Sequence, residues 1–217
     1  MLLLQRCSNS DQALQTPTQI DKNAPQIVRG SFQIRLDAQL LHDCITGKVY
    51  TVNPTPVLDS LYRQACAPVA YPAKKVYAVL RGKVVDETLT VTDIDVMEPK
   101  NPWNTCTPFE FWCSGTEPFW DLEISQAEEG LFYQDIGRER GAKYAWAAPT
   151  INGDTWTYEA PATEGQPAIR VVIKKEKASN GMSDEVYNYS SELTVDGEKH
   201  NGVAIRWGEA RLEPKRR

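Results

Sequence analysis

The stretch Cys113-Ser-Gly-Thr-Glu-Pro-Phe-Trp-Asp-Leu-Glu-Ile124 contains the clearest fold signal in this sequence. Pro118 has no backbone N–H and restricts Glu117 to an extended conformation, so a helix cannot continue through this pair. From Phe119 onward the residues alternate between two faces, and Trp120 begins the apolar face. The pattern predicts a half-buried strand that starts at Phe119 with two adjacent large aromatic residues.

Seven further segments on either side of this strand have a similar short, strand-like pattern. Asn152-Gly153-Asp154 and Asp196-Gly197 separate some of them, and Asp-Gly is typical of tight hairpin loops. The predicted strands are Phe109–Cys113, Phe119–Ile124, Gly130–Asp135, Lys143–Ala147, Thr155–Tyr158, Ala168–Lys175, Tyr187–Val195 and Gly202–Trp207. About eight antiparallel strands without a helix indicate a barrel or a sandwich, and we expect a small β-barrel domain over residues 108–217, with a basic C-terminal tail.

The part before residue 108 combines strands with one helix. Thr55 suits the N-cap and Pro56 the first position of this helix, whose apolar residues recur at helical spacing. The later segment Thr88–Val96 changes its apolar phase midway, which predicts a β-bulge near Thr92-Asp93. Strands around a single helix predict an OB-like barrel over residues 31–107. The chain is therefore expected to be mainly β, with two small domains.

Residues 1–30 are predicted to be a signal remnant followed by a tether. A short Leu-rich run precedes Cys7, and the residues after it are polar and interrupted by prolines. The residues before Cys7 are too few for a complete secretory signal. No stretch is long and apolar enough to be expected to cross a bilayer as a helix.

Five cysteines lie at positions 7, 44, 66, 106 and 113, and none of them forms a C-x-x-C pair. This spacing argues against a zinc ribbon and against a thioredoxin-like redox motif. In an exported chain, two disulfides with Cys7 left over are the natural arrangement. Four cysteines allow three pairings, and the spacing does not choose between them.

The charge of the chain limits its partners. Asp and Glu number 29 against 24 Lys and Arg, which gives a formal net charge of −5. Nucleic acid is not expected as the main ligand, because phosphate binding depends on a basic surface. The sequence also lacks a phosphate-binding loop and a dinucleotide fingerprint, so no cofactor is expected.

A second motif, Asn180-Gly-Met-Ser-Asp184, precedes Tyr187 in the C-terminal part. Together with the G-x-E-P-F-W pattern that ends at Trp120, it resembles the signature of a family of uncharacterised bacterial envelope lipoproteins. In the N-terminal part, the pattern Asp43-Cys-x-Thr-Gly and the helix after it are similar to the OB-like module of NlpE-type lipoproteins.

This resemblance implies a location and a disulfide pattern. It implies a lipoprotein of the Gram-negative cell envelope that faces the periplasm, with an outer-membrane anchor on Cys7. The recurring cysteine pair of the family corresponds to Cys44 and Cys106, which leaves Cys66 to pair with Cys113. The alternative is Cys44–Cys66 with Cys106–Cys113. The resemblance further implies envelope stress or copper homeostasis as the setting.

Two carboxylates, Glu117 and Asp184, lie inside the signature motifs. A hydrolase of envelope polymers would need them to face each other across an open cleft. In a binding protein we expect them to be buried in turns, where carboxylates accept backbone hydrogen bonds. With Phe119, Trp120 and Tyr187 they are candidates for a binding surface, and no catalytic residue is assigned.

No metal site is expected, because His42 stands beside a cysteine expected in a disulfide and His200 lies in a hairpin loop. The favoured function is a non-enzymatic envelope lipoprotein that binds or senses another envelope protein or a cell-wall component. One alternative is an inhibitor similar to the membrane-bound lysozyme inhibitors. The other is a hydrolase that uses Glu117 and Asp184.

Overall fold

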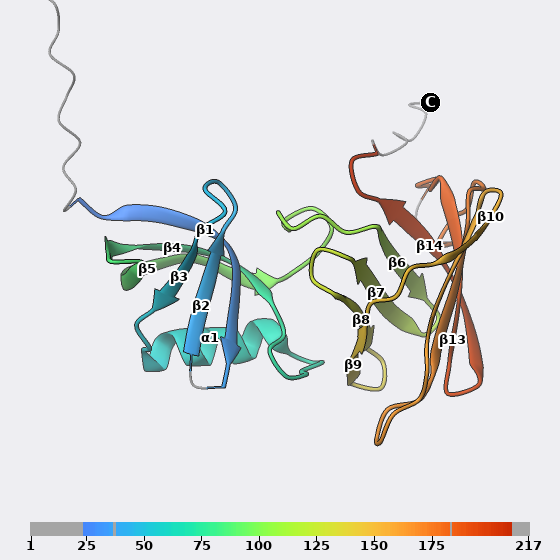
Figure 1. Ribbon diagram of the computed structural model, residues 1–217, viewed down its shortest axis with the longest axis horizontal. Helices are drawn as coiled ribbons and strands as arrows, with labels where there is room; N and C mark the ends of the chain where they lie inside the picture. Colours follow the sequence, from blue (N-terminus) through green and yellow to red (C-terminus); the bar gives the residue numbers. More distant parts are fainter. Residues whose placement is uncertain (1–23, 37, 183, 210–217) are drawn as a thin grey trace, which may run out of the picture.

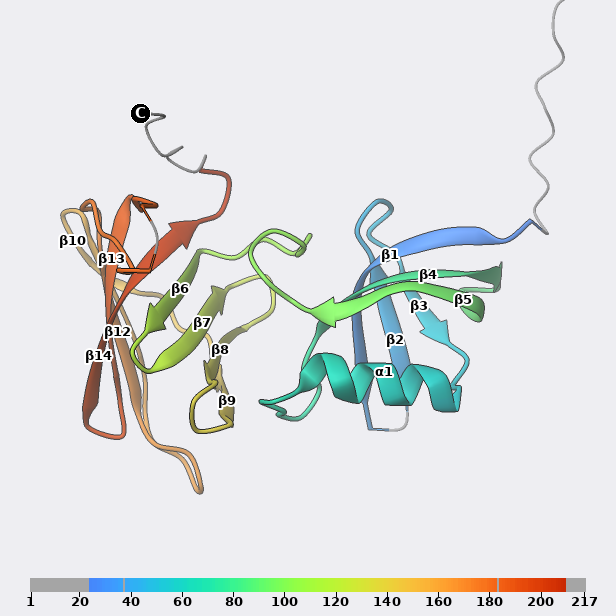
Figure 2. The same ribbon diagram turned by 180° about the vertical axis from the view of Figure 1, so that it is seen from behind.

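The computed structural model describes residues 24–36, 38–182 and 184–209, and these residues form fourteen strands and one helix. They are arranged in two β-rich domains that lie side by side along the long axis of the molecule (Figure 1; Figure 2). The predicted mainly β, two-domain architecture is confirmed. The predicted boundary between residues 107 and 108 falls in the connection between the two domains.

The first domain is a closed five-stranded barrel with the strand order β1-β2-β3-β5-β4. Its elements are β1 (Gln26–Arg35), β2 (Ala38–Asp43), β3 (Val49–Val52), α1 (Pro56–Cys66), β4 (Val76–Val85) and β5 (Thr88–Pro99). The β3–β5 pair is parallel and the other pairs are antiparallel. This topology, with a helix between β3 and β4, confirms the predicted OB-like barrel.

The prediction that the tether extends to residue 30 is wrong. β1 begins at Gln26, and the side chain of Val28 is buried opposite Leu80 of β4. Pro25 and Gly30 lie on either side of the short apolar pair Ile27-Val28, so the segment looks like a linker in the sequence. Its pairing with β4, far away in the sequence, makes it a strand.

The helix α1 begins as predicted. The Thr55 hydroxyl accepts a hydrogen bond from the backbone N–H of Leu58 at 3.2 Å, and Pro56 occupies the first turn, where no N–H is needed. Leu58, Ala65 and Cys66 bury their side chains in the barrel core. The helix lies across one end of the barrel (Figure 1) and packs against β4 and β5.

Two register shifts bend the long hairpin of β4 and β5. One leaves Thr92 of β5 without a direct partner, which confirms the bulge predicted near Thr92-Asp93. The other leaves Asp95 without a partner and was not predicted. The shift at Thr92 brings Val91 and Ile94 to the same core despite their opposite parity, and the shift at Asp95 does the same for Ile94 and Met97. Such bulges let a small barrel curl closed.

The second domain is one antiparallel sheet with the order β10-β11-β12-β13-β14-β6-β7-β8-β9, curled around its own core. Its strands are β6 (Phe111–Thr116), β7 (Phe119–Ser125), β8 (Gly130–Asp135), β9 (Arg140–Ala145), β10 (Thr150–Asn152), β11 (Thr155–Ala160), β12 (Ile169–Lys174), β13 (Tyr189–Val195) and β14 (Glu198–Arg206). The eight predicted strands are all present, Gly130–Asp135 with the same ends and the others with shifted ends, and the three-residue β10 is an addition. The edges of the sheet are β9 and β10.

The G-x-E-P-F-W motif is explained by the packing of one tryptophan. Trp120 is 1% exposed, and its indole ring lies against the backbones of Gly115 on β6 and Gly202 on β14. A Cβ atom at Gly115 would overlap the indole nitrogen, and one at Gly202 would lie 2.8 Å from the ring carbon Cζ2. The motif therefore specifies how three strands pack around Trp120.

The disulfide prediction is half right. Cys44 and Cys106 form a disulfide with a Cα–Cα distance of 5.4 Å, which ties the connection between the domains to the end of β2. Cys66 and Cys113 are free and buried, so the predicted second bridge is wrong, and so is the alternative pairing. The two thiols lie in the cores of different domains, where each packs as a small apolar side chain. Cys7, the predicted lipidation site, lies outside the described residues.

A buried group of charges joins the two domains. The Nζ atom of Lys100, which follows β5, lies 2.6 Å from Glu123 Oε1 and 2.8 Å from Glu128 Oε1 of the second domain. Lys75 approaches the other oxygen of Glu128 at 3.0 Å from the partly exposed side. Burial alone would raise the pKa of Glu128, but the charges of Lys100 and Lys75 hold it below its usual value.

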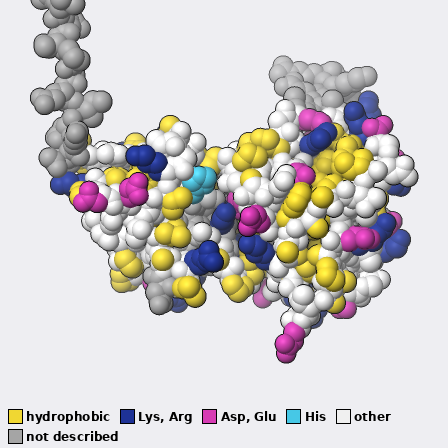
Figure 3. Space-filling view, in the orientation of Figure 1, with side chains coloured by type: hydrophobic (Ala, Val, Ile, Leu, Met, Phe, Trp, Pro, Cys, Tyr) yellow, Lys and Arg dark blue, Asp and Glu magenta, His cyan; other side chains and the backbone are white. Residues whose placement is uncertain are grey.

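The loop after α1 makes the second set of interdomain contacts. Lys74 donates to the carbonyl oxygens of Cys66 and Val69 at 2.8 and 2.5 Å, and to Gln134 Oε1 of β8 at 2.8 Å. The ring of Tyr71 lies 6.4 Å from that of Phe132. Figure 3 shows basic and acidic side chains next to each other where the two domains meet. These contacts hold the loop after α1 on β8 of the second domain.

We predict that Gly115→Ala destabilises the second domain by about 1–3 kcal/mol, because the new methyl group displaces the Trp120 indole. The matched control is Gly137→Ala, where an added Cβ meets its nearest atom at 3.6 Å. The control should change stability by less than about 0.5 kcal/mol. Denaturant unfolding followed by tryptophan fluorescence measures both, and equal stability of the two variants would contradict this account of the motif.

We predict that Lys100→Met lowers the unfolding free energy by about 3–5 kcal/mol, because Glu123 and Glu128 stay buried without the cation they share. Lys75→Met removes only the partly exposed ion pair and should cost less than about 1 kcal/mol. Chemical denaturation of the two variants checks the difference. A Lys100→Met chain as stable as Lys75→Met would show that the interface does not depend on this cation.

Candidate functional site

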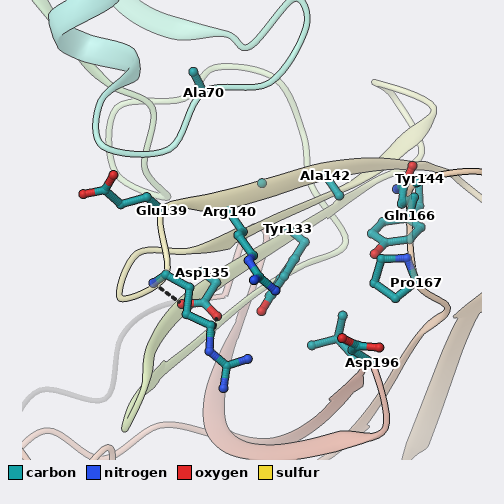
Figure 4. Close-up of a pocket in the computed structure, with 14 residues that line it drawn as sticks. Ala70, Tyr133, Asp135, Glu139, Arg140, Ala142, Tyr144, Gln166, Pro167 and Asp196 are labelled. Carbon is teal, nitrogen blue, oxygen red and sulfur yellow. Dashed lines mark hydrogen bonds and ion pairs between the residues drawn. The ribbon is translucent and has the colours of Figure 1, made fainter.

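The second domain has a cavity of about 450 Å³ at the end nearest to the loop after α1 (Figure 4). Strands β8 and β9 and the hairpin that joins them form one wall. The loop Gly165–Pro167 and the turn after β13 form the opposite wall. Ala70 of the first domain completes the rim. Both domains therefore contribute to the opening of this cavity.

At one side of the cavity, Arg138 is shared between two carboxylates, Asp135 and Glu198. Asp135, which is 2% exposed, accepts a hydrogen bond from the backbone N–H of Arg138 at 2.9 Å. The guanidinium of Arg138 lies 2.7 Å from Glu198 Oε2 and 3.8 Å from Asp135 Oδ2. These groups fix the β8–β9 hairpin against the start of β14.

Two other charged side chains at the opening have no ion-pair partner within the part of the chain that the structure describes. They are Arg140, at the start of β9, and Asp196, in the turn between β13 and β14. Figure 4 shows Arg140 beside Tyr133 and shows Asp196 at the lower edge of the opening. Glu139 extends away from them in the same view. Of the three lining charges without an ion pair among the described residues, Arg140 and Asp196 lie at the opening, and Glu139 points away from it.

Two tyrosines form part of the cavity wall. Tyr133 and Tyr144 are both buried, and burial raises the pKa of each phenol above its usual value. Both remain neutral phenols at physiological pH. Tyr144 stands next to Gln166 and Pro167 (Figure 4), and Gln166 Nε2 donates to the Lys143 carbonyl at 3.0 Å.

That hydrogen bond also shows how the edge strand β9 is oriented. In an antiparallel pair, alternate residues turn their N–H and C=O groups toward or away from the neighbouring strand. Because the Lys143 carbonyl points away from β8 to Gln166, the N–H and C=O of Gly141 point away from β8 as well. Gly141 lines the cavity and packs under Val69 and Tyr71, where a Cβ atom would collide with both side chains.

The residues predicted from the signature motifs lie elsewhere in the second domain. Thr116 donates to the Asn180 carbonyl at 3.0 Å, so the two motifs meet at one end of the sheet. A second hollow there is lined by Glu117 and Asn180 but not by Asp184. The pair of facing carboxylates that a hydrolase would need is therefore not formed in this hollow.

The expectation that the motif carboxylates are buried in turns is wrong. Glu117 lies in the turn before β7 and Asp184 lies after a bend, and both are exposed. Phe119 is half exposed, whereas Trp120 is a core residue. Tyr187 is partly buried and donates to Glu185 at 2.8 Å. Of the five predicted residues, Glu117 is the one that lines this second hollow among the residues that the structure describes.

The residues around the first cavity were not singled out from the sequence. The sequence pattern places Asp196 only in a hairpin turn, and Arg140 lies in a short charged run, Arg138-Glu-Arg140. Among the described residues, no group of three or more His, Cys, Asp or Glu is placed to hold a metal ion. His42 and His200 lie in different domains. No described helix is long and apolar enough to span a membrane.

Comparison with known proteins places the first domain. Residues 22–94 match the family model of the NlpE C-terminal OB domain. No curated protein and no solved structure matches the chain. The matched segment covers β1 to β4 and most of β5, and the observed strand order closes these strands into a barrel. The first domain of this chain is therefore an NlpE-like OB module.

Proposed function

We propose that this chain is a non-enzymatic lipoprotein of the Gram-negative cell envelope that binds or senses a partner there. The NlpE-like OB module fits an envelope lipoprotein. The Cys44–Cys106 disulfide supports an oxidising compartment, since disulfides persist in exported proteins and are rare in the cytosol. An outer-membrane anchor on Cys7, with an envelope-stress or copper-homeostasis setting, is part of the proposal.

The observation that carries the binding role is the cavity at the junction of the domains. Small-molecule sites occur preferentially in concave pockets at domain interfaces, with a few polar groups that converge on the ligand. Here Arg140 and Asp196, which have no ion-pair partner among the described residues, lie at a cavity of about 450 Å³. The partner in this proposal is a cell-wall component or another envelope protein.

The sensing role is supported by the loop after α1. Val69 and Tyr71 of this loop pack on Gly141 of β9, and Ala70 lies at the cavity rim. A ligand that displaces Ala70 or β9 would act directly on the contacts between the domains. A change in the domain orientation is then the signal that a second envelope protein reads.

We predict that a photoreactive amino acid at position 70 crosslinks to an envelope component in intact cells. The same substitution at Val57, which is 60% exposed on α1 and does not line the cavity, should give no such product. Denaturing electrophoresis and mass spectrometry of the envelope fraction compare the two. Crosslinks from position 57 alone, or from neither position, would contradict a binding role for the cavity.

The location is tested on the same fraction by intact-mass measurement and non-reducing digestion. We predict acyl chains on Cys7, a Cys44–Cys106 crosslinked peptide and free thiols at Cys66 and Cys113. An unmodified Cys7 together with reduced Cys44 and Cys106 would show that the chain is not an exported lipoprotein.

A further inference from the structure

The two available charges at the cavity belong to different turns and do not neutralise each other. Arg140 follows the β8–β9 hairpin, and Asp196 forms the tip of the β13–β14 hairpin. Within the described residues neither makes an ion pair, although Arg138, two residues from Arg140, is held by Glu198 and Asp135. Both side chains are exposed, and the charge of Arg140 also acts on Glu198. A cation and an anion at one cavity match a ligand that carries both charges.

We propose that this cavity binds an amino acid or short peptide with a free carboxylate and a free ammonium group. The inference rests on the proposed binding function and names the ligand class. The guanidinium of Arg140 receives the carboxylate, and the carboxylate of Asp196 receives the ammonium group. A planar guanidinium suits this role because it donates two parallel hydrogen bonds to a carboxylate.

Backbone and tyrosine groups complete the carboxylate side. The N–H of Gly141 points away from β8 at the cavity wall, and the described residues provide no hydrogen-bond partner for it. Tyr133 lies beside Arg140 (Figure 4), and its raised pKa keeps the hydroxyl protonated as a donor. Three donors therefore surround the position of a ligand carboxylate, next to the β9 edge.

The remaining wall selects for a small apolar body. Ala142, Pro167 and Val195 also line the cavity. Such a wall suits short aliphatic side chains better than the many hydroxyl groups of a saccharide, each of which would need a polar partner. A purely anionic ligand would meet the repulsion of Asp196.

The test is calorimetric titration of the full-length protein with four probes. They are the dipeptide alanyl-alanine, its N-acetylated form, its C-terminal amide, and the neutral disaccharide diacetylchitobiose. We expect the free dipeptide to bind, and each blocked form to bind about tenfold more weakly, as expected for the loss of one charge-assisted hydrogen bond. The disaccharide should not bind.

Two variants assign the charges. Arg140→Met should remove the difference between the dipeptide and its amide, while the difference for the acetylated form remains. Asp196→Asn should remove the difference between the dipeptide and its acetylated form, while the difference for the amide remains. Asparagine tolerates the left-handed backbone at this position, where φ is 53°. Arg170→Met is the control, because Arg170 lies on β12 in an exposed pair with Glu159 and does not line the cavity.

The inference is overturned if the free and blocked dipeptides bind equally, or if no probe binds at concentrations on the order of 10 mM. It is also overturned if Arg140→Met and Asp196→Asn each still bind the free dipeptide more tightly than both blocked forms. Binding of the disaccharide alone would overturn the ligand class and leave the proposed binding function in place. Failure of the position-70 crosslink would instead count against the proposed function itself.

Discussion

The relation between the two domains depends on the buried ammonium group of Lys100, which forms ion pairs with both Glu123 and Glu128. Taking three charges out of water is costly, and it is tolerated only where the geometry is close and each charge has its partners. Because Lys100 directly follows β5, this contact fixes the end of the first barrel on β7 and the loop after it. Lys74 adds a hydrogen bond to Gln134 of β8. The cavity of the second domain therefore acquires its rim at Ala70 only when these polar contacts are made, and the fold of either domain alone would leave it open on that side.

Local sequence patterns predicted the helix and most of the strands. The predictions that were wrong depend on contacts between segments far apart in the sequence. Thr55 and Pro56 mark the start of α1 because capping depends on neighbouring residues. The alternation after Phe119 likewise predicts β7, since the side-chain period of a strand is a property of a few residues. By contrast, the start of β1 depends on β4, and β10 is too short to carry a pattern. The Cys66–Cys113 bridge was excluded by the two separate cores, a fact of tertiary structure.

The site was less predictable than the fold, for a physical reason. The signature motifs contain the residues that pack together, such as Gly115 against Trp120, and packing demands specific shapes at specific positions. Arg140 and Asp196 lie in two hairpins far apart in the sequence, and only the curling of the sheet brings them to one opening. Charged residues in hairpins are common on any surface, so neither stands out before the fold is known. The strongest sequence signal therefore marked the core of the second domain, and the cavity lies at other residues.

The Cys44–Cys106 disulfide also determines how the molecule would respond to tension. A chain anchored at one end and held by a partner at the other is pulled along its backbone, and the path of the force crosses the disulfide from Cys44 to Cys106. The segment between them, which spans a sequence separation of 62 and contains α1 and most of the first barrel, is bypassed. In the oxidised chain roughly 210 Å of contour length is thus withheld from stretching, at about 3.4 Å per residue. Reduction of this one bond would turn a short, stiff connection into a long, extensible one.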